Sequence, residues 1–165
     1  MRLMLMRHAK TEDGQGKEDF QRMLTDIGKE QADQAADFLH EHQIDKMLVS
    51  YVKRTMQTSA IIAEKAPAEE SEMVSELYEG DEDAIINLIS SQEDRNKHLL
   101  VIGHNPLIYN VAMSLSNSNS DKYNELIATS MPTARIIVID FHDIDSWGKI
   151  LTQKGDILEI FTPNQ

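Results

Sequence analysis

The sequence predicts an α/β domain with a mainly parallel central sheet and helices on both of its faces. Three short apolar runs of strand length, at residues 2–6, 46–50 and 98–102, are separated by segments with helical patterns. Helices that alternate with strands are typical of βαβ crossovers, which produce parallel sheets covered on both sides. In such sheets ligands bind outside the carboxyl ends of the strands, so functional residues are expected at that edge.

The first half of the chain is expected to hold two helices. Residues 9–24 are polar and carry two Gly, which indicates a long loop of the kind that is often functional. Thr25 is a suitable N-cap for a helix that runs to about His42. Small apolar residues at helical spacing form its expected buried face: Ala32, Ala35, Ala36 and Leu39. A second helix is expected over 53–65, with Pro67 just beyond its end.

The second half is expected to begin with a strand at 73–77 and a helix that is capped by Asp81 and runs through Ile89. After the strand at 98–102, a helix from Pro106 to about Leu115, a polar loop at 116–125 and a strand at 134–141 are expected. Two short strand-like runs follow, around Ile150 and around Leu158. No repeat and no linker interrupts this pattern, so a single domain over 1–165 is expected.

Composition excludes several classes of function. The chain has 16 Lys and Arg against 28 Asp and Glu, a net charge of −12. That field repels a nucleic-acid backbone and an anionic membrane, so neither is expected as a partner. The absence of Cys excludes disulfides, zinc–thiolate sites and thiolate nucleophiles. No apolar run approaches the roughly 18 residues of a membrane span, and a soluble, monomeric, cytoplasmic protein is expected.

Basic and imidazole side chains follow three of the predicted strands directly. Arg7 and His8 follow the first strand, Arg54 lies in the helix after the second, and His104 follows the third. The fold brings these three strand ends to one edge. Two guanidinium groups can bind a tetrahedral dianion, and a neutral imidazole can accept a phosphoryl group. Each residue alone has a plainer interpretation, as a structural His, a solvated charge or a turn.

Four short motifs, in order along the chain, resemble those of the histidine phosphatase (phosphoglycerate mutase-like) superfamily. Residues 5–10 (LMRHAK) resemble its Arg-His-Gly motif, and residues 24–28 (LTDIG) resemble its Leu-Thr-x-x-Gly helix start. Residues 50–58 (SYVKRTMQT) and 103–106 (GHNP) resemble its second-Arg and second-His motifs. The resemblance covers nearly the whole chain. The string Arg-His-Ala-Lys and the short chain are most similar to the SixA-type phosphohistidine phosphatases.

This resemblance implies a phosphoglycerate mutase-like fold and a role for each matching residue. His8 would be the nucleophile and become transiently phosphorylated, while Arg7, Arg54 and His104 would hold the phosphoryl oxygens. No metal or other cofactor is implied. Ser50 and Thr11 are further candidates for substrate contact. Thr11 matches a longer form of the first motif, Arg-His-Gly-x-Thr. That form has Asn three residues after the Thr, where this chain has Gly14.

Glu79 is the candidate general acid, because Leu77-Tyr78-Glu79 fits a Leu-x-Glu pattern of many relatives. The alternative is that the acidic run around it is a solvated face or a helix cap. The expected function is hydrolysis of phosphohistidine on a partner protein. The alternatives are a phosphatase of small esters such as sugar phosphates and a non-catalytic phosphate-binding module. Neither the His40 and His42 pair nor the acidic segment 140–147 has the spacing of a metal site.

Overall fold

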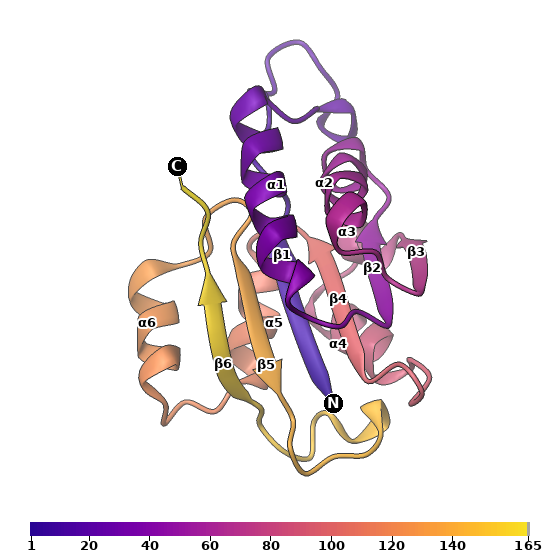
Figure 1. Ribbon diagram of the computed structural model, residues 1–165, viewed down its shortest axis with the longest axis vertical. Coiled ribbons are helices and arrows are strands. Elements are labelled where there is room, and N and C mark those ends of the chain that lie inside the picture. Colours follow the sequence, from indigo (N-terminus) through magenta and orange to yellow (C-terminus); the bar gives the residue numbers. More distant parts are fainter. Residues whose placement is uncertain (165) are drawn as a thin grey trace.

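A six-stranded sheet lies between two layers of helices in residues 1–164, the part of the chain that the computed structural model describes (Figure 1). The strand order is β3 (Glu70–Val74), β2 (Lys46–Ser50), β4 (His98–Gly103), β1 (Arg2–Arg7), β5 (Ile136–Asp140) and β6 (Asp156–Phe161). The first four are parallel to one another, β5 is antiparallel to β1, and β6 is antiparallel to β5. The predicted α/β class with a mainly parallel sheet is therefore confirmed.

The central strand β1 is buried on both faces. Leu3 and Leu5 belong to one hydrophobic cluster, whereas Met4 and Met6 belong to the cluster on the opposite face. All four side chains are fully buried. Successive side chains of a strand point to opposite faces, so a strand between two helical layers must be apolar throughout.

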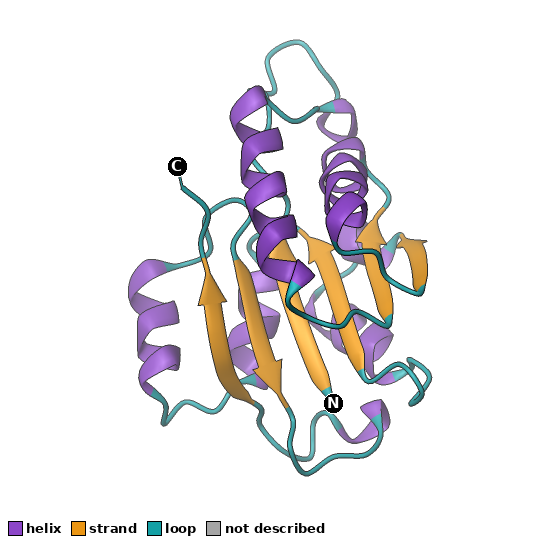
Figure 2. Cartoon of the chain, viewed as in Figure 1, coloured by secondary structure: helices purple, strands orange, loops and turns teal. Residues whose placement is uncertain are grey.

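Different helices cover the two faces (Figure 2). On one side lie α1 (Asp26–His40) and α2 (Lys53–Lys65), and on the other lie α3 (Glu76–Glu79), α4 (Glu82–Ser90), α5 (Leu107–Leu115) and α6 (Asp121–Thr129). The expected caps are confirmed, since Thr25 accepts a hydrogen bond from Gly28 N at 3.0 Å and Asp81 accepts one from Ala84 N at 2.9 Å. Among residues 1–164, no helix has the length and apolar character that crossing a membrane requires.

Three sequence-based expectations for the second half are wrong in detail. Helix α6 occupies part of the expected loop, because Ser120 caps it and Leu126 buries its apolar face. Strand β3 begins at Glu70, and residues 76–77 already belong to α3. This edge strand pairs only with β2 and so needs little apolar sequence. Ile150 is buried after a short 3₁₀ turn, η2 (Trp147–Lys149), rather than in a strand.

Candidate active site

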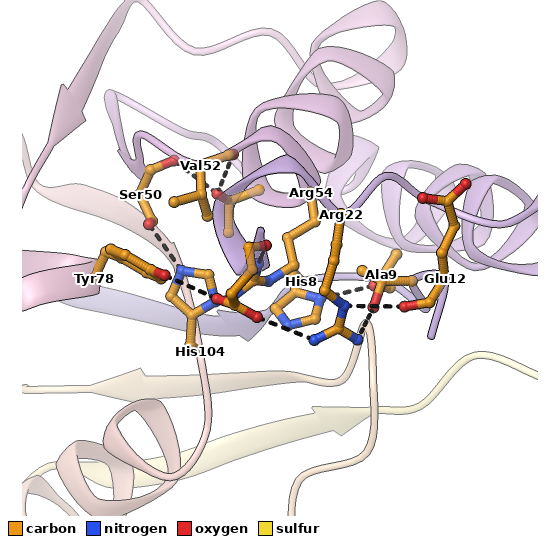
Figure 3. A network of polar contacts seen from close by, with 12 residues as sticks. His8, Ala9, Glu12, Arg22, Ser50, Val52, Arg54, Tyr78 and His104 are labelled. Carbon is orange, nitrogen blue, oxygen red and sulfur yellow. Dashed lines mark hydrogen bonds and ion pairs between the residues drawn. The ribbon is translucent and has the colours of Figure 1, made fainter. Parts of the chain in front are cut away.

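The carboxyl ends of three parallel strands meet where the sequence predicted them. Arg7, the last residue of β1, lies beside Gly103, the last residue of β4, in the sheet register. His8 and His104 follow directly, and their ring centroids lie 5.2 Å apart. Arg54, from the first turn of α2, lies beside the two rings (Figure 3). Segments about 50 residues apart in the chain therefore place two imidazoles and two guanidiniums together.

His8 is held as a neutral, nucleophilic imidazole. Its main-chain N–H donates to Gly103 O at 3.0 Å, and the residue is only 7% exposed. Its Nδ1 lies 2.8 Å from Ala9 O. A carbonyl oxygen can only accept, so Nδ1 carries the proton and Nε2 keeps its lone pair. Burial, aided by the nearby positive charges, lowers the pKa of His8 from 6.5 to about 3, so the ring is neutral near pH 7.

His104 is held by the end of β2. The Oγ of Ser50 lies 2.8 Å from His104 Nε2, whereas Nδ1 is buried and has no protein partner. Burial and then the charge of Arg54 lower the pKa of His104 to about 4. The serine hydroxyl can donate to Nε2, and His104 then presents an Nδ1–H toward any ligand.

Both arginines also keep one buried nitrogen without a partner. The guanidinium of Arg54 donates from Nη1 to Asp19 O at 2.7 Å and from Nη2 to Asp19 Oδ2 at 3.0 Å. Arg7 donates from Nη1 to Met131 O at 3.0 Å. The Nε–H groups of both arginines are buried and unpaired. A buried donor without a partner costs about 1–3 kcal/mol of folding stability. This group of unpaired donors therefore indicates a binding site for an anionic ligand.

Three further residues complete the polar network, and sequence reasoning did not find them. The Asp19 carboxylate accepts hydrogen bonds from Arg54, from Tyr78 Oη at 2.8 Å and from Arg22 Nη1 at 3.2 Å. The ring of Tyr78 makes an edge contact with His104, with 5.5 Å between centroids. It also lies 5.9 Å from Arg54 Cζ. Asp19 belongs to the loop between β1 and α1, where nothing in the spacing of the sequence points to Arg54.

The model of the histidine phosphatase superfamily (branch 1) matches residues 3–93, just over half of the chain. The chain belongs to this superfamily. A curated relative, an uncharacterised protein of Mycobacterium tuberculosis, is 33% identical over 138 residues, which are 81% of this chain and 85% of the relative. An uncharacterised protein of Mycobacterium leprae is 27% identical over 165 residues, covering 96% of this chain and 99% of the relative.

Solved structures share the fold of this histidine phosphatase. The candidate phosphohistidine phosphatase SixA of Nakamurella multipartitia has a TM-score of 0.86 at 24% identity, over 98% of this chain and 95% of that one. A mycobacterial glucosyl-3-phosphoglycerate phosphatase has a TM-score of 0.69 at 14% identity, over 99% of both chains. The predicted phosphoglycerate mutase-like fold is confirmed. Family and fold together support a phosphatase, an enzyme that hydrolyses phosphoryl groups.

The remaining three candidates of the sequence analysis have different surroundings in this histidine phosphatase. Ser50 is fully buried, and its Oγ lies 2.8 Å from His104 Nε2, so it can orient that ring. The contact with substrate that the sequence suggested for Ser50 stays a prediction. Thr11 Oγ1 accepts a hydrogen bond from Arg22 Nη2 at 2.6 Å, which ties it to the loop. Glu79 is exposed on α3 and accepts a hydrogen bond from Tyr51 Oη at 2.7 Å. Its role as an acid stays a prediction.

The two histidines near the end of α1 have different partners in the structure. His40 Nδ1 lies 2.7 Å from Lys65 O, whereas His42 Nε2 lies 3.7 Å from Glu159 Oε1, so the two rings serve different partners. Within residues 1–164 no group of three or more His, Asp or Glu side chains is arranged to hold a metal ion.

Proposed function

We propose that this protein is a phosphatase that hydrolyses phosphohistidine on a partner protein through a covalent phospho-His8 intermediate. The observation that carries the proposal is the neutral His8 ring, with a free Nε2 lone pair, beside buried N–H donors that lack partners. A nucleophile next to preorganised donors is the arrangement that phosphoryl transfer requires.

In the first step His8 Nε2 forms a bond to phosphorus as the bond from phosphorus to the substrate's ring nitrogen breaks. The pair of electrons leaves with the substrate imidazole, which takes its proton from the medium. Arg7, Arg54 and His104 donate to the three phosphoryl oxygens, and the two guanidinium groups balance the negative charge in the transition state. Side-chain cations supply this charge, so the step uses no metal ion.

In the second step water attacks the phosphorus of phospho-His8. The bond from phosphorus to Nε2 breaks, its electrons return to Nε2, and inorganic phosphate leaves. The hydrogen bond from Nδ1 to Ala9 O is kept throughout, so the ring returns in the same tautomer. The cycle consumes one phosphohistidine and one water and yields histidine and phosphate.

The surroundings of Glu79 favour phosphohistidine over an ester. An ester releases an alkoxide, which needs a positioned acid that typically contributes about 10²–10⁴ in rate. Imidazole has a pKa of about 6.5 and departs readily once its ring is protonated. Among residues 1–164 no hydrogen bond joins Glu79 to His8, His104 or Arg54, and its carboxylate is engaged by Tyr51. The SixA neighbours, one of them described as a protein histidine phosphatase, support the same substrate class.

The second candidate is a phosphatase of small phosphate esters. The observation that favours it is the likeness to the mycobacterial glucosyl-3-phosphoglycerate phosphatase, which shares the fold over 99% of the chain. Glu79 lies on the same short helix, α3, as Tyr78, whose ring contacts His104. The third possibility is a non-catalytic binding module. The neutral His8 ring argues against it, because its Nε2 keeps the lone pair that a nucleophile needs.

Rates on two substrate classes separate these candidates. Wild type, Glu79→Gln and the control Glu76→Gln, from the same helix, are assayed on a phosphohistidine-carrying protein and on a panel of sugar phosphates. We expect faster turnover of phosphohistidine and less than about threefold loss for Glu79→Gln on it, because no acid is needed. Faster turnover of a sugar phosphate that Glu79→Gln abolishes, with Glu76→Gln unchanged, would establish the small-ester activity instead.

A further inference from the structure

The Arg54 guanidinium is hydrogen-bonded to a single residue, Asp19, of the loop between β1 and α1. Asp19 takes two of the three guanidinium nitrogens, Nη1 with its main-chain oxygen and Nη2 with its carboxylate. The third nitrogen, Nε, is buried and unpaired. We propose that Asp19 is a positioning residue, which fixes the Arg54 guanidinium so that Nε–H remains available to the phosphoryl group. This inference rests on the proposed function.

The two-point contact between Asp19 and Arg54 explains how Asp19 can position the guanidinium. A free arginine side chain populates many rotamers, and a two-point contact with a carboxylate removes most of that freedom before substrate binds. The Arg54 side chain is 5% exposed and that of Asp19 is 50% exposed. Asp19 therefore lies at the mouth of the site and holds the guanidinium without filling the buried side where Nε lies.

Asp19 is itself fixed by two residues from different parts of the chain. Tyr78, on α3, donates to Oδ2, and Arg22 donates to Oδ1. Arg22 is in turn anchored by Thr11 Oγ1 and by Glu12 O, at 3.0 Å from its Nε (Figure 3). The loop, α2 and α3 thus converge on one carboxylate. Burial opposes its charge, but the hydrogen bonds from Tyr78, Arg54 and Arg22 and the charge of Arg54 together lower its pKa to about 2.

A carboxylate on a phosphate-binding arginine could instead act as a competitor that substrate must displace. The unpaired nitrogens argue against this role. Arg7 Nε, Arg54 Nε and His104 Nδ1 are all without protein partners while Asp19 is in place. Asp19 therefore leaves these three nitrogens without a partner, and an anion that binds them does not have to displace its carboxylate. The two roles predict opposite effects of removing the carboxylate. Anion affinity falls if Asp19 positions Arg54, and it rises if Asp19 competes with the anion.

The test compares Asp19→Asn and Asp19→Ala with Asp26→Asn. Asp26 is a matched control, because it also pairs with a cation, Lys29, and its side chain is 96% exposed. Orthovanadate affinity and turnover of an aryl phosphate are measured for each protein. We expect Asp19→Asn to lower kcat and vanadate affinity by about 10-fold and Asp19→Ala by up to about 100-fold, the range seen when a supporting residue is removed. Asp26→Asn stays within twofold, and circular dichroism verifies that each variant is folded.

A double-mutant cycle identifies the route of the effect. If Asp19 acts through Arg54, Asp19→Asn in an Arg54→Lys background costs less than about threefold, because lysine lacks the two-pronged contact. Undiminished loss in that background, unchanged turnover in Asp19→Asn, or tighter vanadate binding would each overturn the inference. Should wild type hydrolyse no phosphate compound, the proposed function fails, and the vanadate affinities still decide the role of Asp19.

Discussion

At the scale of single residues, burial decides the chemistry of His8. The folded protein keeps this ring neutral down to a pKa of about 3, whereas the unfolded chain protonates it near 6.5. Between these values the unfolded state binds more protons, so the free energy of unfolding falls as the pH falls. From pH 6.5 to pH 5 we expect a loss of about 1–2 kcal/mol through His8. Urea unfolding at both pH values shows a smaller loss in His8→Asn, and the exposed control His40→Asn keeps the full loss. Equal losses in all three proteins would contradict the assignment.

The four candidate site residues at the strand ends were predictable from the sequence, and the residues that hold them in place were not. Arg7, His8, Arg54 and His104 stand at strand ends, where the parallel-sheet rule brings distant segments together. Asp19 lies in a polar loop with other acidic residues, and its partner is 35 residues away. The contact depends on the path of the loop, which no periodicity encodes. Ser50 ends its strand, as the sequence predicts, but only the structure shows that it faces His104.

At the scale of elements, Gly28 in the first turn of α1 allows this helix to pack closely against the segment that follows β1. A Cβ on Gly28 would lie 1.9 Å from the main-chain oxygen of Lys10, so only glycine lets α1 approach the segment that follows His8. We expect Gly28→Ala to destabilise the fold by at least about 1–3 kcal/mol and to lower kcat by displacing His8. Gly14→Ala is the control, since its Cβ would meet only the flexible Arg22 side chain, at 3.6 Å from Cδ and 4.0 Å from Nε. Unfolding midpoints and turnover measure both effects. Unchanged stability and turnover in Gly28→Ala would show that the close approach has no consequence.

Elements with a strong apolar period were predicted well, and those at the edge of the fold were not. The central strands β1, β2 and β4 match their expected ranges to within one residue. The edge strand β3 was placed about three residues late, because one-sided pairing leaves it polar. The polar sequence of α6 predicts a loop, although Ser120 as N-cap and Asp121 in the first turn are signals of a helix start.

At the scale of the whole molecule, β1 contributes side chains to both hydrophobic clusters, so we expect the two faces of the sheet to unfold as one cooperative unit. Trp147 is the only tryptophan and is buried in the cluster on one face, whereas Met6 belongs to the cluster on the other. We expect Trp147 fluorescence and far-ultraviolet circular dichroism to report one coincident unfolding transition. Met6→Ala shifts both probes equally, by about 2–5 kcal/mol. If only the dichroism signal moved, the two faces would unfold separately.

The central claim, a phosphoryl group carried by His8, is tested most directly by trapping it. The enzyme is mixed with a ³²P-labelled phosphohistidine protein, quenched within milliseconds and digested, and the labelled peptide is sequenced by mass spectrometry. We expect an acid-labile, alkali-stable label on His8 that forms before phosphate is released, and its absence from His8→Asn together with the loss of turnover. Turnover that persists in His8→Asn, or a label on another residue, would contradict the mechanism.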